Sequence, residues 1–226
     1  QQGASRFFVK ALEKAAIIAY NHELDFEKSL KFYTELEKNA TSEDMLFEAQ
    51  LGALRSAYRT KNSASVYSYA AKVNNNPRAN NAQIATANFY LGKLAFDNQD
   101  FNNALSGFQK VVQLSDNEQT AEARYLIAYI YYQRRDLNKA QELCLKANQE
   151  SSAYPYWVAN SVLLLADVMA EKGDLYNARA VLEALLENYN EDQELVNKAK
   201  TRLGQINRQI EQSSILNKSG GSENRD

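Results

Sequence analysis

Several residue types are scarce in this chain of 226 residues, and each scarcity limits what the protein can be. Cys144 is the single cysteine, so no disulfide can form within the chain. Two prolines and eight glycines are too few for frequent tight hairpins, which argues against a β-sheet fold. No apolar run approaches the roughly 20 residues that cross a bilayer, so we expect no membrane-spanning segment. A net charge of -2 gives no reason to expect a nucleic-acid partner.

The residues that are present are those of an ordinary globular protein. Apolar residues make up 45% of the chain and charged residues 24%, both typical values. The chain begins at Gln1 rather than at a methionine, which we interpret as a mature or truncated product.

A pattern of small and large residues recurs along the chain. Its clearest marker is a small residue, and the markers are Ser29, Ala64, Ala104, Ala140 and Ala178. They are separated by 35, 40, 36 and 38 residues, and periods in this range are typical of a solenoid of helical hairpins. Four of the five markers are preceded by an aspartate that can accept hydrogen bonds from the first amides of a second helix: Asp25, Asp100, Asp136 and Asp174.

The third unit carries the pattern most completely, in Leu91, Gly92, Ala95, Ala104 and Phe108. These residues resemble the tetratricopeptide repeat, a helix-turn-helix unit of about 34 residues. The first unit matches least, because Ile17 is bulky where a small residue is usual and Ser29 replaces the alanine. The alternative is another kind of helical solenoid with hairpins of similar length.

The resemblance implies an all-α fold, a right-handed α-α superhelix of about five helical hairpins. We expect one array over residues 1–212, with repeats at about 10–43, 45–78, 85–118, 121–154 and 159–192. A last amphipathic helix at 192–212 would cap the array, because its apolar residues recur at helical spacing. From 213 to 226 the composition of Ser, Asn, Gly and charge predicts disorder.

No catalytic or metal-binding constellation stands out in the sequence. His22 is the only histidine, and no nucleophile is placed beside it by any motif, so we interpret it as a surface residue. Cys144 falls on the face of a predicted second helix that packs in the core, where a thiol is inert. His and Cys residues lack metal-ligand spacing. We therefore expect neither enzymatic activity nor a cofactor.

The resemblance also implies a binding surface, because the first helices of such repeats line a concave groove. The inward positions of the third and fourth repeats provide five aromatic rings, with polar and charged residues near them there and in the fifth repeat, and such clusters often mark a binding site. The predicted contacts for a protein or peptide are Phe89, Lys93, Phe96, Tyr125, Tyr129, Tyr132 and Asp167. The alternative is that these rings pack across neighbouring first helices and contact no ligand.

The leading interpretation is a non-catalytic scaffold that binds a protein or peptide in this groove. One alternative is an assembly module that forms a homo-oligomer through Phe7, Phe8 and Val9 or through the last helix. Another is an accessory region of a larger protein with an upstream domain. The abundance of Tyr, Asn and Gln and the irregular spacing are similar to bacterial tetratricopeptide proteins of the cell envelope, which suggests a periplasmic or envelope location.

Overall fold

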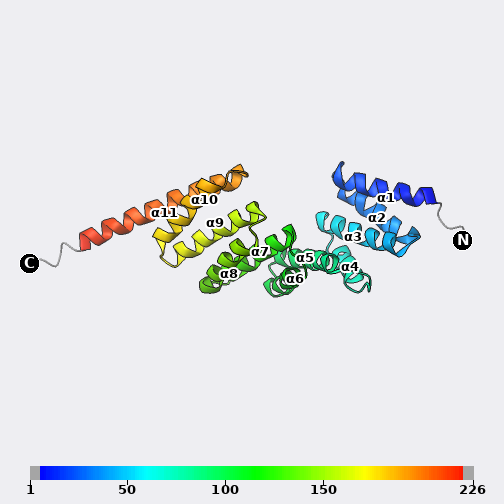
Figure 1. The fold of residues 1–226 in the computed structure, drawn as a ribbon, viewed down its shortest axis with the longest axis horizontal. Coiled ribbons are helices and arrows are strands. Elements are labelled where there is room, and N and C mark those ends of the chain that lie inside the picture. Colours follow the sequence, from blue (N-terminus) through cyan, green and yellow to red (C-terminus); the bar gives the residue numbers. More distant parts are fainter. Residues whose placement is uncertain (1–5, 221–226) are drawn as a thin grey trace, which may run out of the picture. The chain divides into compact units, whose positions relative to one another are not determined.

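A computed structural model describes residues 6–220, and within that range every regular element is a helix (Figure 1). The chain divides into two compact units, Gln1–Gln119 and Thr120–Asp226. Unit 1 contains three helical hairpins, α1 (Arg6–Asn21) with α2 (Phe26–Asn39), α3 (Glu43–Arg59) with α4 (Ser63–Asn74), and α5 (Asn81–Asp97) with α6 (Phe101–Leu114). Unit 2 contains α7 (Glu118–Gln133), α8 (Leu137–Glu150), α9 (Pro155–Glu171), α10 (Leu175–Asn188) and α11 (Gln193–Gly220). This confirms the predicted all-α architecture of consecutive hairpins. That the two units form a single array stays a prediction.

The turn inside each hairpin has the same backbone conformation. A residue with positive φ ends each turn, and these residues are Leu24, Lys61, Gln99, Arg135 and Gly173, with φ between 54° and 82°. Only glycine adopts this left-handed region without a steric cost, so Gly173 is the least strained of the set. Each is followed directly by the residue that caps the second helix.

The predicted aspartate caps are confirmed in three of the four hairpins that have one. The carboxylates of Asp25, Asp100 and Asp136 each accept a hydrogen bond from the backbone amide three residues later, at 2.9 to 3.2 Å. Asp174 occupies the same position but makes no cap bond to the backbone. Its carboxylate instead accepts a hydrogen bond from the side-chain amide of Asn177, at 2.9 Å.

Large side chains pack against glycine in unit 1. A Cβ added at Gly92 would lie 2.8 Å from the Phe108 ring, and one added at Gly52 would lie 2.3 Å from the Tyr33 ring. Gly107 faces the backbone of α5 directly, because an added Cβ would lie 2.9 Å from the Asn88 carbonyl oxygen. The glycines therefore set the distance between neighbouring helices.

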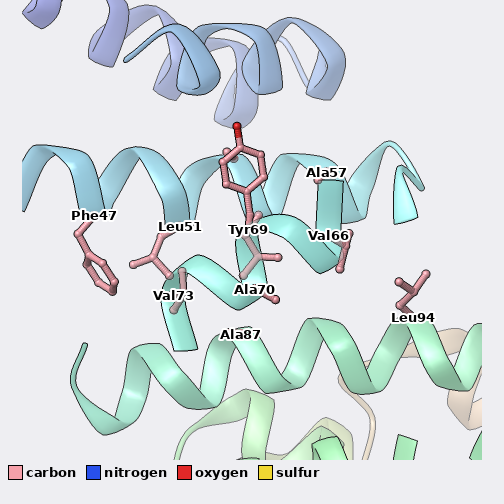
Figure 2. Close-up of a cluster of buried hydrophobic side chains, with 11 residues drawn as sticks. Phe47, Leu51, Ala57, Val66, Tyr69, Ala70, Val73, Ala87 and Leu94 are labelled. Carbon is pink, nitrogen blue, oxygen red and sulfur yellow. The ribbon is translucent and has the colours of Figure 1, made fainter. Parts of the chain in front are cut away.

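The core of unit 1 joins α3, α4 and α5 (Figure 2). Leu51, Val73 and Leu94 are buried among these helices, and the Tyr69 ring lies with them while its hydroxyl points toward α2. Ser29, the residue that departs from the repeat pattern, is fully buried. Its hydroxyl lies 3.1 Å from the Ala16 carbonyl oxygen and therefore has an acceptor in the interior.

In unit 2 the last helix covers the last hairpin, as the apolar spacing of its sequence predicts. Leu195, Ala199, Ile206 and Ile210 of α11 are buried in a cluster with Leu182 of α10. The helix continues to Gly220, so residues 213–220, for which composition predicts disorder, are helical. The rest of that predicted tail, residues 221–226, lies outside the described residues. None of the described helices, α11 included, combines the length and the apolar character that a bilayer crossing requires.

Candidate functional site

Three adjoining cavities form an open trough in unit 2, which we call the inner trough. It is lined by α7, α9 and α11, which are the first helix of each hairpin and the capping helix. The cavities measure about 440, 320 and 140 Å³. Asp167 and Arg202 line both of the larger cavities, and Tyr132 and Glu171 line both of the smaller ones, so the three are continuous.

The middle of the inner trough is occupied by an ion pair between α9 and α11. Asp167 Oδ2 accepts a hydrogen bond from Arg202 Nη2 at 3.2 Å, and Asp167 Oδ1 lies 2.5 Å from Arg202 Nε without hydrogen-bond alignment. Burial raises the pKa of the Asp167 carboxyl, and the guanidinium of Arg202 opposes that rise. The Asp167 side chain is only 19% exposed whereas that of Arg202 is 43% exposed, so the cation faces solvent and the anion lies beneath it.

A second charged group closes the α7 end of the inner trough. The Tyr132 hydroxyl donates a hydrogen bond to Glu171 Oε1, and Arg135 pairs with Glu171 Oε2. Burial, and then the hydrogen bond to Glu171, raise the pKa of Tyr132 to about 12. The Tyr132 hydroxyl therefore stays protonated near neutral pH, where it serves as a hydrogen-bond donor.

A continuous run of aromatic rings leads away from Tyr132 along α7 and onto α9. Successive ring centroids are 6.3 Å apart for Tyr132 and Tyr129, 6.2 Å for Tyr129 and Tyr125, 5.8 Å for Tyr125 and Trp157, and 5.0 Å for Trp157 and Tyr156. Burial raises the pKa of Tyr125 above the ordinary value. Trp157 Nε1 is a buried donor with no acceptor among the described residues.

The structure brings four of the predicted groove residues together in unit 2. Tyr132 and Asp167 line the inner trough itself, and Tyr125 and Tyr129 belong to the aromatic run beside it. All four are half-buried, and the three tyrosines pack against a buried cluster formed by residues of α7, α8 and α9. Each tyrosine ring is therefore packed against neighbouring helices over part of its surface, as the alternative interpretation expects, and exposed over the rest.

The other three predicted groove residues lie on α5 in unit 1. Phe89 is only 5% exposed and packs against Phe108, with ring centroids 6.3 Å apart, so it is a core residue. Phe96 is half-buried against Phe101 and Phe108. Lys93 is also half-buried. Of this group, Lys93 and Phe96 present some surface to a ligand and Phe89 does not.

Sequence reasoning missed two residues that shape the inner trough and its aromatic run. Trp157 lies in the first turn of α9, two residues before the expected start of its repeat at 159, so the repeat frame excluded it. Arg202 is not among the apolar residues whose spacing predicts the capping helix. It lies three residues after the buried Ala199 and four before the buried Ile206, and this spacing places it at the edge of the buried face.

The two residues considered for chemistry lie where the sequence analysis placed them. His22 is exposed just after α1, and Cys144 is fully buried among Ala128, Ala140 and Leu165. Burial raises the pKa of the Cys144 thiol to about 12, so it is protonated and unreactive at neutral pH. No cluster of three or more His, Cys, Asp or Glu side chains in the described part of the chain is arranged to hold a metal ion.

Comparisons with known proteins agree with this architecture. Residues 161–191, which include most of α9 and all of α10, match the model of the tetratricopeptide repeat family. Among solved structures, the crystal structure of BtubC (BKLC) from P. vanneervenii is similar to this chain with a TM-score of 0.55 and 13% sequence identity, over 96% of this chain and 91% of that chain. At this identity the likeness concerns the fold alone. No curated protein matches the sequence. The match identifies hairpin α9–α10 as a tetratricopeptide repeat, in the frame that the sequence predicts, and the all-helical hairpin fold of the described residues agrees with it.

Proposed function

We propose that this protein is a non-catalytic scaffold that binds an extended segment of a partner protein in the inner trough of unit 2. Tetratricopeptide repeats and the helical-repeat fold suggest a protein-interaction scaffold. The observation that carries the finer proposal is the continuity of the three cavities between Glu194 on α11 and Gln133 on α7. A continuous open trough fits a linear segment better than a compact ligand.

The chemistry of the trough suits a segment with apolar and charged side chains. The rings of Tyr129 and Tyr132 offer large surfaces that lose little conformational freedom on binding. The ion pair of Asp167 with Arg202 lies in the trough with its cation toward solvent, so a partner's carboxylate can pair with Arg202. The amides of Asn197 and Gln205 line the same wall and can bond the backbone of a bound segment.

In unit 1, Lys93 and Phe96 on α5 are proposed as a second set of contacts. Phe96 is held by ring contacts to Phe101 and Phe108, and Phe89 supports Phe108 from the interior. We assign Phe89 to packing. We expect Lys93 to pair with a charged side chain of the partner and Phe96 to contact an apolar one.

Selection from a peptide library tests the proposal across many candidate sequences at once. Random peptides of about 12 residues, displayed on phage, are panned on the full chain, and affinities of the enriched peptides are measured for variants. We expect Tyr129→Ala and Asp167→Arg each to weaken binding by about tenfold or more, because they remove an anchor ring and invert a buried charge. Tyr176→Ala is the matched control, since Tyr176 is an exposed tyrosine of α10 outside the trough.

Two results would contradict the proposal. One is a set of enriched peptides whose affinity is the same for Tyr129→Ala, Asp167→Arg and the unchanged chain, while circular dichroism shows all three folded. The other is equal loss of affinity in Tyr176→Ala, which would place the contact on another face.

The wider context of the scaffold is also a proposal. A net charge of -2 supports a protein partner over a nucleic acid. A bacterial cell-envelope location stays a prediction from the sequence resemblance, as does the alternative of an accessory region attached to an upstream domain. Fractionation of the native host and the length of the full gene product test these two points.

A further inference from the structure

Unit 2 has a second cavity on a different face of α9, and we call it the outer notch. It measures about 510 Å³ and lies between α8 and α10 with α9 as its floor. Its lining is apolar, with Val158 and Val162 on α9, Val181 and Ala184 on α10, and Leu145 on α8. Leu145 is 51% exposed at its edge. The notch therefore offers an apolar surface that a partner's side chains could fill.

One residue that lines the outer notch carries a polar atom without a hydrogen-bond partner. Asn148 of α8 lines the notch, and its side-chain oxygen is buried without a hydrogen-bond donor among the described residues. A buried acceptor of this kind costs free energy until a donor reaches it. An occupant of the notch that carries an N–H donor would satisfy this acceptor.

The first helix of the same chain presents a matching surface. One face of α1 is buried through Val9, Leu12 and Ala16. The opposite face carries Phe7 and Ile18, which are spaced by about three helical turns and are 86% and 47% exposed. The hairpin of α1 therefore leaves two large apolar side chains of this helix exposed.

The charges around the two surfaces are complementary. Lys14 is exposed on the same face of α1, between Phe7 and Ile18, and Lys10 is exposed beside it. Glu142 lies three residues before the lining residue Leu145 on α8, Glu187 lies one residue before the lining residue Asn188 on α10, and both glutamates are exposed. Glu142 pairs with Lys139, and no ion pair to Glu187 is present among the described residues. The ammonium groups of the α1 lysines therefore have the charge that complements these glutamates, and they have N–H donors for the side-chain oxygen of Asn148.

We propose that the Phe7–Ile18 face of α1 in one copy docks in the outer notch of a second copy. The two surfaces differ, so the contact is heterologous and each copy keeps a free α1 face or a free notch. Such contacts continue head to tail into chains or rings, whereas a two-fold symmetric dimer would stop at two copies. This self-association uses a different face from the inner trough and is independent of the proposed function.

Sedimentation equilibrium of the full chain tests the proposal. The average mass of the unchanged protein should rise with concentration past that of a dimer, up to about 200 μM, because each added copy offers a new surface. We expect Phe7→Glu and Ala184→Arg each to weaken association by about tenfold or more, since each buries a charge at the apolar contact. Both sites are exposed, so the fold should survive, as circular dichroism can verify.

Matched controls and a mixing experiment make the test specific. Ala180→Arg, on the same helix but outside the notch lining, and Tyr67→Glu, at an exposed aromatic of α4, should associate like the unchanged chain. An equimolar mixture of Phe7→Glu and Ala184→Arg should form dimers and stop there, because the mixture retains one intact α1 face and one intact notch per pair.

A charge exchange tests the orientation. Lys14→Glu and Glu187→Lys should each weaken association by about threefold, and the two together in one chain should restore it. A monomer at all concentrations would overturn the proposal. So would a dimer that Ala184→Arg leaves intact, or a mixture that stays monomeric. Unchanged association of Phe7→Glu would overturn it too, because another segment or another protein would then occupy the notch.

Discussion

The same place between neighbouring second helices is closed in unit 1 and open in unit 2. In unit 1, the hydroxyl groups of Thr34 on α2 and Tyr69 on α4 are hydrogen-bonded at 3.0 Å. Three residues further along each helix, the ammonium group of Lys72 donates a hydrogen bond to the Glu37 carboxylate at 2.7 Å. Glu37 also accepts a hydrogen bond from Gln50 of α3, at 3.0 Å. These contacts bridge the two second helices across the floor formed by α3.

In unit 2 the equivalent positions carry residues that cannot form this bridge. The equivalent positions are five and eight residues after each marker residue. On α8, Leu145 and Asn148 stand where α2 has Thr34 and Glu37. On α10, Glu183 and Leu186 stand where α4 has Tyr69 and Lys72. The space stays open as the outer notch. Of these four residues, Leu145 and Asn148 line the notch. The comparison shows that neighbouring second helices are bridged by polar side chains in unit 1, whereas a cavity lies between them in unit 2.

The largest expected effect concerns the tight packing of unit 1. Gly107→Ala places a Cβ 2.9 Å from both the Asn88 carbonyl oxygen and Gly92 Cα, so the backbones of α5 and α6 must separate. We expect the free energy of unfolding of unit 1 to fall by about 2 to 3 kcal/mol. Hydrogen exchange, read separately for residues of each unit, measures the loss.

The matched control for that prediction lies in unit 2. Gly204 is in α11, and a Cβ added there meets no atom within 4 Å. Gly204→Ala should therefore stabilise unit 2 by about 0.5 to 1 kcal/mol through helix propensity alone. Equal destabilisation of both units by Gly107→Ala would show that they unfold as one, and the comparison between them would lose its basis.

A smaller effect is expected from opening the bridge of unit 1. Lys72→Met removes the cation from Glu37, whose side chain is only 14% exposed, and removes a cation contact to the Tyr69 ring at 4.6 Å. We expect unfolding by urea to show a loss of about 1 kcal/mol. Lys139→Met in unit 2 is the control, because Lys139 and Glu142 are both well exposed and their pair should contribute nothing measurable. A similar loss in both variants would contradict the assigned role of the bridge.

The smallest effect is a pH dependence at the inner trough. Burial raises the pKa of Asp167 in the folded chain above its unfolded value, so ionisation of Asp167 lowers stability as pH rises through that folded pKa. Asp167→Asn removes this titration. The stability of the variant relative to the unchanged chain should therefore increase from about pH 3 to pH 7. Thermal unfolding at several pH values measures the stability of the variant relative to the unchanged chain. A relative stability that falls from pH 3 to pH 7 would contradict the raised pKa of Asp167.

The hairpins and their frame could be predicted because their signals are local. The period of the marker residues and the aspartates before them specify where each second helix begins, and the caps of α2, α6 and α8 follow from neighbouring residues. The apolar spacing after residue 192 specified the capping helix in the same way. The continuation of that helix to Gly220 was not predicted, since composition alone does not decide whether a polar segment extends a helix already formed.

The candidate site was predicted only in part. Family positions identify which side of a first helix faces inward, and Tyr132 and Asp167 do line the inner trough. Phe89 has the same pattern but is buried, because Phe108 of α6 lies against it. Such a contact depends on how far one helix is rotated against the next, and no repeat pattern encodes that rotation.

By itself the sequence determined that this protein is a series of helical hairpins and where each hairpin turns, since both depend on residues close together in the chain. Only the tertiary structure decided which inward rings meet solvent, that Arg202 of the last helix pairs with Asp167, and that a notch opens between α8 and α10. The physical reason is that these features join side chains some 30 to 40 residues apart, and their contacts depend on the packing of three helices at once.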